Sequence, residues 1–287
     1  MTAIAVQPLI GAEFDNPAEV TVRRTQTYVV CSTPRSGSGL LCRGLGATGI
    51  AGAPLEYFHP AYRALLSRRW GCGSDLRAYV EALQVRRTSR TGVLGTKLHW
   101  HQLEAVHAEA QLATTPGAQF EQCAGLVEEL LGARPSYVRV VRRDVHRQAV
   151  SLWTAEHTGV WSRTKDDAGA APRRVPYSFA GIRRCLERIA IGEVHWDRFF
   201  RLEEVHPVEV TYEELSSDYA GAVARVLQRL VPDARAEIAP PITVRQADER
   251  SEELLERFLA DLSRARFGSP SQRARLLLVR ALPRRRW

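Results

Sequence analysis

The sequence predicts an α/β fold in which helices flank a central, parallel, P-loop-like sheet. Short apolar runs typical of buried strands recur at wide intervals, at Tyr28–Cys31, Val93–Leu98, Tyr137–Val141 and Val208–Thr211. Helical patterns fill the stretches between these runs, as the crossover connections of a parallel sheet require. A Ser/Gly-rich turn after the first strand agrees with this fold, because such sheets bind ligands beyond the carboxyl ends of their strands.

The predicted helices are marked by apolar residues at helical spacing. They cover Leu40–Ala47, Leu76–Val85, Phe120–Leu131, Val145–Glu156, Phe179–Leu202 and Tyr219–Leu230. Asp144 provides an N-cap for the fourth of them. The stretch 162–176, with its charges, Gly and Pro, predicts a mobile loop. We expect one domain over residues 27–263, preceded by an irregular segment, 1–26, and followed by an Arg-rich tail, 264–287.

The composition, 45% hydrophobic and 25% charged, is that of a soluble globular protein. The first 26 residues lack the basic start and apolar block of a signal peptide. No apolar run reaches the roughly 20 residues that span a bilayer. The five cysteines are widely spaced, odd in number and without a C-x-x-C pair, which predicts reduced thiols and neither a disulfide framework nor a zinc site. We therefore expect a cytoplasmic protein.

The net charge of +8 comes from the tail. From Arg264 onward there are eight arginines and no acidic residue, and the rest of the chain carries 32 basic and 32 acidic residues. A neutral body argues against nucleic-acid binding. The tail has the pattern of a short basic amphipathic helix, which could rest on the body, on a partner subunit or on an anionic membrane surface. A partly disordered, solvated terminus is the simplest interpretation.

The turn Thr33–Ser38 predicts an anion-binding loop. It joins a buried strand to a helix N-terminus, where backbone N–H groups and the helix dipole favour negative charge. Arg35 adds a guanidinium with a planar set of donors. The loop differs from the G-x-x-x-x-G-K-[ST] motif, because its cation precedes the Ser-Gly-Ser triplet and no Lys-Ser/Thr pair follows. From this segment alone, an ordinary Ser/Gly connection is the alternative.

A second anion-binding pattern follows a later strand. Arg142 stands at the end of that strand, and Ser151 lies two turns into the next helix. Both side chains can converge on one tetrahedral anion. The structural alternatives are an ion pair for Arg142 and a packed helix face for Ser151.

In this order, the two segments resemble the sulfotransferases that use 3′-phosphoadenosine 5′-phosphosulfate (PAPS), and in particular the mycobacterial trehalose 2-sulfotransferase family. The family pattern S-x-R-S-G-S, A-T-G-x-A-G-x-P-x-E-x-F and R-x-D-x-x-x-Q-A-V-S-x-W is largely matched by Ser32–Ser38, Ala47–Phe58 and Arg142–Trp153. Arg245–Ser251 is similar to the family's C-terminal signature. The resemblance spans about Tyr28–Asp261 and implies the three-layer sulfotransferase fold.

The resemblance implies a role for each matched residue. The residues that would bind the 5′-phosphosulfate are Arg35, Ser36, Gly37, Ser38 and Gly39. Those that would bind the 3′-phosphate are Arg142 and Ser151, with Arg143 as a less certain contact. Those that would close over the nucleotide are Arg245, Gln246 and Arg250.

Glu56 falls on the acid that serves the family as catalytic base. Its neighbours Tyr57 and Phe58 are expected to desolvate it and raise its pKa toward the working pH. His59 is the alternative base, since other sulfotransferase branches use a histidine. The predicted acceptor contacts are Tyr57, Phe58, His59, Lys97 and Trp100. The structural alternatives are a surface acid or helix cap for Glu56, a helix-capping imidazole for His59, a surface ion pair for Lys97 and core packing for Trp100.

These expectations describe an enzyme that transfers the sulfuryl group of PAPS, in line, to an acceptor hydroxyl. The acceptor is left open among a sugar, a glycolipid and a hydroxylated natural product, because Ala53 stands where the family carries a second acid that helps hold the sugar. No metal is predicted, since His99 and His101 have no third ligand nearby. A homodimer is implied by the family alone.

Two other functions compete with this interpretation. A nucleotide-dependent phosphotransferase would need a lysine and magnesium ligands that the sequence lacks. A non-catalytic nucleotide- or anion-binding protein would act through the basic tail.

Overall fold

The chain forms two compact units, each built from separate stretches of sequence. The computed structural model describes residues 8–17, 19–20, 22–110, 121–132, 134–163, 175–232, 235–243 and 248–267. The sheet unit contains the described residues within 6–143 and 191–242. The helical unit contains the described residues within 144–190 and from 243 onward.

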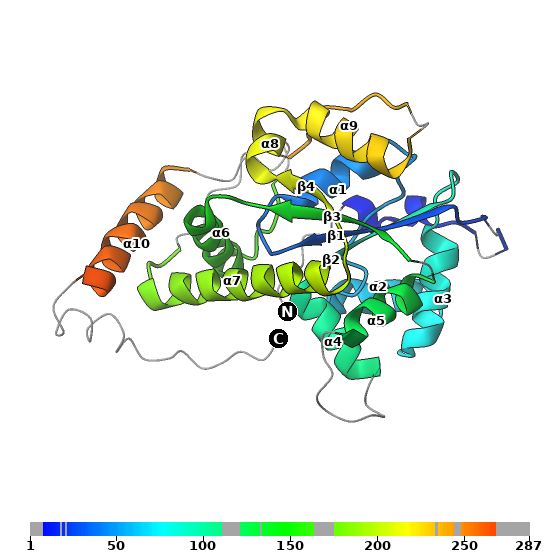
Figure 1. The fold of residues 1–287 in the computed structure, drawn as a ribbon, viewed down its shortest axis with the longest axis horizontal. Coiled ribbons are helices and arrows are strands. Elements are labelled where there is room, and N and C mark those ends of the chain that lie inside the picture. Colours follow the sequence, from blue (N-terminus) through cyan, green and yellow to red (C-terminus); the bar gives the residue numbers. More distant parts are fainter. Residues whose placement is uncertain are drawn as a thin grey trace. The chain divides into compact units, whose positions relative to one another are not determined.

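The sheet unit is built on four parallel strands in the order β2-β1-β3-β4 (Figure 1). The strands are β1 (Gln26–Ser32), β2 (Val93–His99), β3 (Ser136–Val141) and β4 (Val208–Thr211). The register pairs Ser32 with His99 and with Val140, and Val141 with Thr211. All four strands therefore end at the same edge of the sheet. The predicted α/β fold with a parallel sheet is confirmed.

Helices cover both faces of this sheet (Figure 1). Those on one face are α1 (Ser38–Ala47), α8 (Tyr212–Ser217) and α9 (Tyr219–Leu230). Those on the other face are α4 (Trp100–Ala110), α5 (Glu121–Leu131) and the part of α7 (Phe179–Leu202) that starts at Ile191. The remaining helices of the sheet unit are α2 (Pro60–Trp70) and α3 (Leu76–Arg87). Among the described helices, none combines the length and apolar character needed to cross a membrane.

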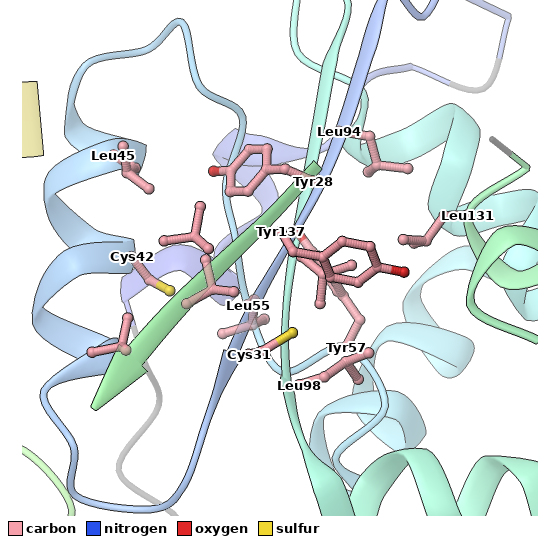
Figure 2. Close-up of a cluster of buried hydrophobic side chains, with 14 of the residues drawn as sticks. Tyr28, Cys31, Cys42, Leu45, Leu55, Tyr57, Leu94, Leu98, Leu131 and Tyr137 are labelled. Carbon is pink, nitrogen blue, oxygen red and sulfur yellow. The ribbon is translucent and has the colours of Figure 1, made fainter. Parts of the chain in front are cut away.

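The core of the sheet unit lies on both faces of the strands (Figure 2). Cys42 of α1 lies on one side, and Leu131 of α5 lies beside Tyr137 on the other. Tyr28 is fully buried, and its hydroxyl donates to the carbonyl of Ala51 at 2.8 Å. Because both faces are covered, β1 and β2 are buried almost throughout their length, which explains the apolar run Tyr28–Cys31 in β1.

The helical unit contains α6 (Val145–Thr158), α7 up to Ala190 and α10 (Glu249–Phe267). Its own core includes Trp153, Phe179 and Phe258. The predicted tail begins at residue 264, but α10 continues to Phe267. Residues 268–287 of the tail, and residues 164–174 of the predicted mobile loop, lie outside the described residues.

Arg87 fastens the N-terminal segment to the sheet unit. That segment contains two short 3₁₀ helices, Pro8–Ile10 and Ala12–Phe14. Arg87 is 2% exposed and pairs with Asp15 through Nε and Oδ1, 2.8 Å apart. Its guanidinium also donates to the carbonyl of Leu9 at 2.7 Å and lies over the rings of Tyr57 and Trp70. Within its described residues, the predicted irregular segment is therefore held against the sheet unit by Arg87.

Arg87→Met is expected to lower the free energy of unfolding by about 3 kcal/mol, because it breaks one side of a buried ion pair. Urea denaturation measures this loss. Arg77→Met is the matched control, since Arg77 pairs with Glu81 on the exposed face of α3. That control should change the unfolding free energy by less than about 0.5 kcal/mol. Equal losses in both variants would show that Arg87 does not hold the segment.

Candidate active site

The carboxyl ends of the four strands bring the predicted site residues of the sheet unit to one edge. The loop 33–37 follows β1, Lys97 and His99 end β2, Arg142 follows β3, and Tyr212 follows β4. These residues are far apart in the sequence, and the parallel register alone brings them together. This edge is where parallel sheets place their ligands.

The loop after β1 has an unusual backbone. Gly37, the N-cap of α1, has φ +90°, and Arg35 has φ +66°, which side chains other than glycine rarely adopt. A Cβ on residue 37 would lie 2.8 Å from Cδ2 of Tyr212. Both the positive φ and the lack of space therefore require glycine there. Gly37 supplies no capping side chain, so no side chain of the N-cap residue competes with an anion for the first amides of α1.

Two arginines lie at this loop, Arg35 within it and Arg142 after β3. Burial, followed by the nearby Arg142 guanidinium, lowers the pKa of the half-buried Arg35 to about 10. Arg142 in turn lies over the ring of Tyr212, with its guanidinium carbon 4.3 Å from the ring centroid. The two positive charges repel each other, and a bound anion near both would relieve that repulsion.

The Ser36 hydroxyl points to the same kind of ligand. The residue is 0% exposed, and its Oγ has no hydrogen-bond partner among the described residues. An unsatisfied buried hydroxyl costs about 1–3 kcal/mol. A phosphate or sulfate oxygen at this loop would accept the missing hydrogen bond, so Arg35–Gly37 fits a bound oxyanion.

A polar network behind the loop fixes its position. Thr33 is buried, and its Oγ1 donates to Glu193 Oε1 of α7 at 2.7 Å. Glu193 Oε2 accepts from Arg139 Nη2 of β3 at 3.0 Å. The carbonyl of Ser32 accepts from Trp196 Nε1 at 3.2 Å. The part of α7 in the sheet unit therefore fixes the position of the loop through Glu193 and Trp196.

Glu56 reaches the strand ends because its own segment runs along β2. Leu55 forms a single parallel bridge with Thr96, and its carbonyl accepts from the Lys97 N–H at 2.9 Å. Gly52 packs against the same strand, since a Cβ there would lie 2.9 Å from the Val93 carbonyl oxygen. This alignment sets the Glu56 side chain beside that of Lys97.

The Glu56 carboxylate is 8% exposed, and each of its oxygens has a donor. Lys97 Nζ lies 2.6 Å from Oε1, and Gln102 Nε2 lies 2.6 Å from Oε2. His99 Nε2 lies 3.7 Å from Oε1. The structure therefore excludes the surface alternatives for Glu56 and Lys97, because the two form a buried ion pair.

The expected rise in the pKa of Glu56 is wrong. Burial does raise it, but the charge of Lys97 and hydrogen bonds from Lys97 and Gln102 together hold the pKa of Glu56 well below its ordinary value. Tyr57 and Phe58, the neighbours expected to desolvate it, are core residues. The carboxylate is ionised throughout the physiological pH range.

His99 lies between the Glu56 carboxylate and the loop. Its Nδ1 lies 2.9 Å from the Ser32 carbonyl, which only accepts, so Nδ1 carries the proton. Burial lowers the pKa of His99 to about 3, so the ring is neutral and Nε2 has no proton to donate. The His99 and His101 rings lie 5.7 Å apart, and no three His, Cys, Asp or Glu side chains within the described residues gather to hold a metal.

The model of the Stf0 sulphotransferase family matches residues 27–261. The chain belongs to this family. It is 31% identical over 269 residues to the trehalose 2-sulfotransferase of Mycobacterium tuberculosis, a match that covers 84% of this chain and 97% of that relative. It is 31% identical over 261 residues to the trehalose 2-sulfotransferase of Mycolicibacterium smegmatis, covering 83% and 96%. The predicted resemblance is confirmed, and the chain is a sulfotransferase.

The other predicted acceptor contacts of the sulfotransferase fall into two groups. His59 caps α2, where its Nδ1 accepts from the Ala61 N–H at 3.3 Å, and burial lowers its pKa. Tyr57 and Phe58 are buried at 0% and 3% exposure, and Trp100 at 4% packs edge-on against Trp196. These three rings therefore lie in the core of the sulfotransferase, and His59 and Lys97 remain beside Glu56.

The remaining predicted nucleotide contacts are distributed as follows. Gly39 lies in the first turn of α1, with open space around its Cα. Ser151 belongs to α6 of the helical unit and is half-buried, and Arg250 is exposed in the first turn of α10. Arg245 and Gln246 lie outside the described residues.

Sequence reasoning missed Gln102 and Tyr212 of the sulfotransferase. Tyr212 opens α8 within a capping box, in which Thr211 before it and Glu214 after it exchange hydrogen bonds. The motif Thr-x-x-Glu at a strand end was a usable signal for a helix start at the ligand edge. Gln102 carried no such signal, because only the fold brings it to Glu56.

Lys97→Met is expected to raise the pKa of Glu56, because burial stays and the counter-charge goes. Carbon-13 NMR of labelled glutamate, with Glu56→Gln identifying the signal, should show no wild-type midpoint above about pH 4. The variant should show one between about pH 5 and 9. Because the pKa of Glu56 is lower in the folded than in the unfolded wild-type chain, its ionised carboxylate stabilises the fold above about pH 4.3. This stabilisation is lost as the pH falls through the pKa of Glu56 in the folded chain. A variant without a midpoint in that range would contradict the ion pair.

Proposed function

We propose that this sulfotransferase moves the sulfuryl group of PAPS to a hydroxyl of a sugar or sugar-bearing acceptor, with Glu56 as general base. The observation that carries the proposal is the buried carboxylate of Glu56, held by Lys97 and Gln102 at the sheet edge that also bears the Arg35 loop. The loop with Arg35 can hold the anionic sulfuryl donor, and the ionised Glu56 can accept the proton of the acceptor hydroxyl. Both lie at the same edge of the sheet.

The donor half is assigned to Arg35–Gly39 and Arg142. The fully buried Ser36 hydroxyl, which has no hydrogen-bond partner within the described part of the chain, and the mutual repulsion of Arg35 and Arg142 support an oxyanion at the loop. Arg35 and the loop amides would take the 5′-phosphosulfate, and Arg142 the 3′-phosphate. The family resemblance also implies a nucleotide-binding role for Ser151, Arg245 and Gln246, and this role stays a prediction.

The reaction follows from these assignments. The acceptor oxygen forms a bond to sulfur while the bond from sulfur to the phosphate oxygen breaks, and 3′-phosphoadenosine 5′-phosphate leaves with that electron pair. The acceptor proton passes to Glu56. A low pKa suits this base, because a loose transition state leaves the hydroxyl proton in place until the oxygen has bonded to sulfur and become strongly acidic. Arg35 and the loop amides stabilise the charge that grows on the leaving phosphate.

We propose a carbohydrate hydroxyl as the first acceptor to test, because both relatives are named for trehalose. His59 and Lys97 are the proposed acceptor contacts beside Glu56. Ala53 is 5% exposed, and its carbonyl accepts from the Tyr57 hydroxyl at 2.5 Å. It offers no carboxylate to a sugar, so glycolipids and hydroxylated natural products belong in the acceptor screen with trehalose.

Calorimetry tests the donor assignment. The wild-type chain should bind 3′-phosphoadenosine 5′-phosphate and should not bind ATP with magnesium at the same concentration. A screen of trehalose, other sugars and glycolipids, read out by release of the bisphosphate from PAPS, then identifies the acceptor. Preference for ATP, or binding of neither nucleotide, would refute the proposal.

A further inference from the structure

The orientation of the Gln102 side chain is fixed by the backbone. Gln102 lies in the first turn of α4 and is 2% exposed. Its Oε1 accepts from the His99 N–H at 3.0 Å, so its amide group must face the other way. There, Nε2 donates to Glu56 Oε2 at 2.6 Å. The amide therefore cannot flip without losing both hydrogen bonds.

The surroundings of Glu56 give this single bond its importance. The titratable groups that face the carboxylate are Lys97 and His99 of β2, His59 at the start of α2, and Cys42 of α1. Lys97 brings a full positive charge to Oε1. His99 is neutral and offers no proton to it. Gln102 is thus a neutral donor to Oε2, opposite the cation at Oε1.

We propose that Gln102 is a positioning residue for Glu56 that holds the carboxylate in one orientation and keeps it from turning both oxygens onto Lys97. The proposal rests on the base role of Glu56 stated above. Each carboxylate oxygen has two lone pairs, so Oε2 keeps one for the acceptor hydroxyl while Gln102 occupies the other. Without Gln102, Oε2 would be buried without this donor, and rotation toward the ammonium would remove it from the acceptor.

The test uses Gln102→Met, which keeps the length of the side chain and removes both of its hydrogen bonds, the one to Glu56 and the one from the His99 N–H. A misplaced catalytic group lowers the rate about 10²-fold, so kcat should fall by that order. Binding of 3′-phosphoadenosine 5′-phosphate should match that of Gln84→Met, whereas the melting temperature should fall further, because the buried His99 N–H and Glu56 Oε2 each lose a partner. This control removes a glutamine that donates to the Leu130 carbonyl on α5, away from the site.

A double-mutant cycle separates positioning from a general structural role. If Gln102 acts through Glu56, Gln102→Met should lower kcat no further once Glu56→Gln is in place. Gln102→Glu adds a pH readout. Its carboxylate still accepts from the His99 N–H but sits against Glu56, which should raise the pKa of the pair and move the acid limb of kcat/KM to higher pH than in wild type.

The outcomes distinguish the two proposals. A fall in kcat for Glu56→Gln with wild-type kcat for Gln102→Met would overturn the positioning role and leave the base role intact. Multiplying effects in the double variant would overturn it as well. A wild-type rate in Glu56→Gln would overturn the base role and, with it, this inference. Loss of bisphosphate binding in Gln102→Met would show that the residue serves the fold of the whole edge.

Discussion

Glu56→Gln is expected to lower kcat for sulfuryl transfer by about 10²- to 10⁴-fold, the usual contribution of a positioned general base. The variant keeps the size of the side chain but cannot take up the acceptor proton. Its amide also faces donors on both sides, from Lys97 and Gln102, so one of these contacts becomes donor against donor. Steady-state kinetics with PAPS and the acceptor found by screening measure the loss.

Two further variants define what this loss means. Glu56→Asp keeps the charge and withdraws it by one methylene, so an intermediate rate is expected from misplacement alone. Glu81→Gln, on the exposed face of α3, is the matched control and should retain wild-type kcat. Affinity for 3′-phosphoadenosine 5′-phosphate should stay at the wild-type value in all three. Full activity in Glu56→Gln would require another base, and His59 would then be the residue to test.

Arg35→Ala is expected to weaken binding of 3′-phosphoadenosine 5′-phosphate by about 10- to 150-fold. Hydrogen bonds to charged groups contribute about 1.5–3 kcal/mol, and each 1.4 kcal/mol is a factor of ten. Arg142→Ala should weaken binding by a similar factor, because its guanidinium faces the same loop. Calorimetry measures both affinities. Added salt should weaken binding to the wild-type chain, and it should weaken binding to each variant by a smaller factor.

The stability of the empty protein separates a binding arginine from a structural one. Arg35 sits at φ +66° beside a second guanidinium, and both features disfavour the unliganded state. Arg35→Gly, which tolerates that backbone conformation, should therefore melt no lower than wild type while losing affinity. Arg77→Ala, exposed on α3, should change neither quantity. A large drop in melting temperature with unchanged affinity would assign Arg35 to the fold.

Local patterns in the sequence predicted the frame of the sheet unit. The four strands and α9 fall where apolar runs and helical spacing place them, and β4 and α9 agree in both bounds. The helix α2 was missed because its apolar spacing is irregular. Its signals are its caps, His59 before Pro60 and Gly71 with φ +70° after the last turn. The helix α4 was missed because it continues from His99 without a break.

The site divides in the same way between local and distant information. The Arg35 loop could be predicted because a strand, a Ser/Gly turn and a helix start are neighbours in sequence. The state of Glu56 could not, because Lys97 and Gln102 are 41 and 46 residues away and reach it only through the pairing of its segment with β2. The same limit explains why Tyr57 and Trp100 were predicted to contact the acceptor. An aromatic residue beside a motif gives the same sequence pattern whether its ring faces a ligand or the core.

The segment that carries Glu56 also protects an exposed side of the sheet. β2 is an edge strand, and an uncovered edge invites pairing with another chain. Gly52 lies against Val93, and Leu55 bridges to Thr96, so the run from 52 to 56 shields this edge. Substitutions that detach the run, such as a bulky residue at Gly52, would therefore make the protein prone to aggregation as well as inactive. Resistance to self-association and placement of the acid are thus two outcomes of one stretch of five residues, and selection on either constrains both.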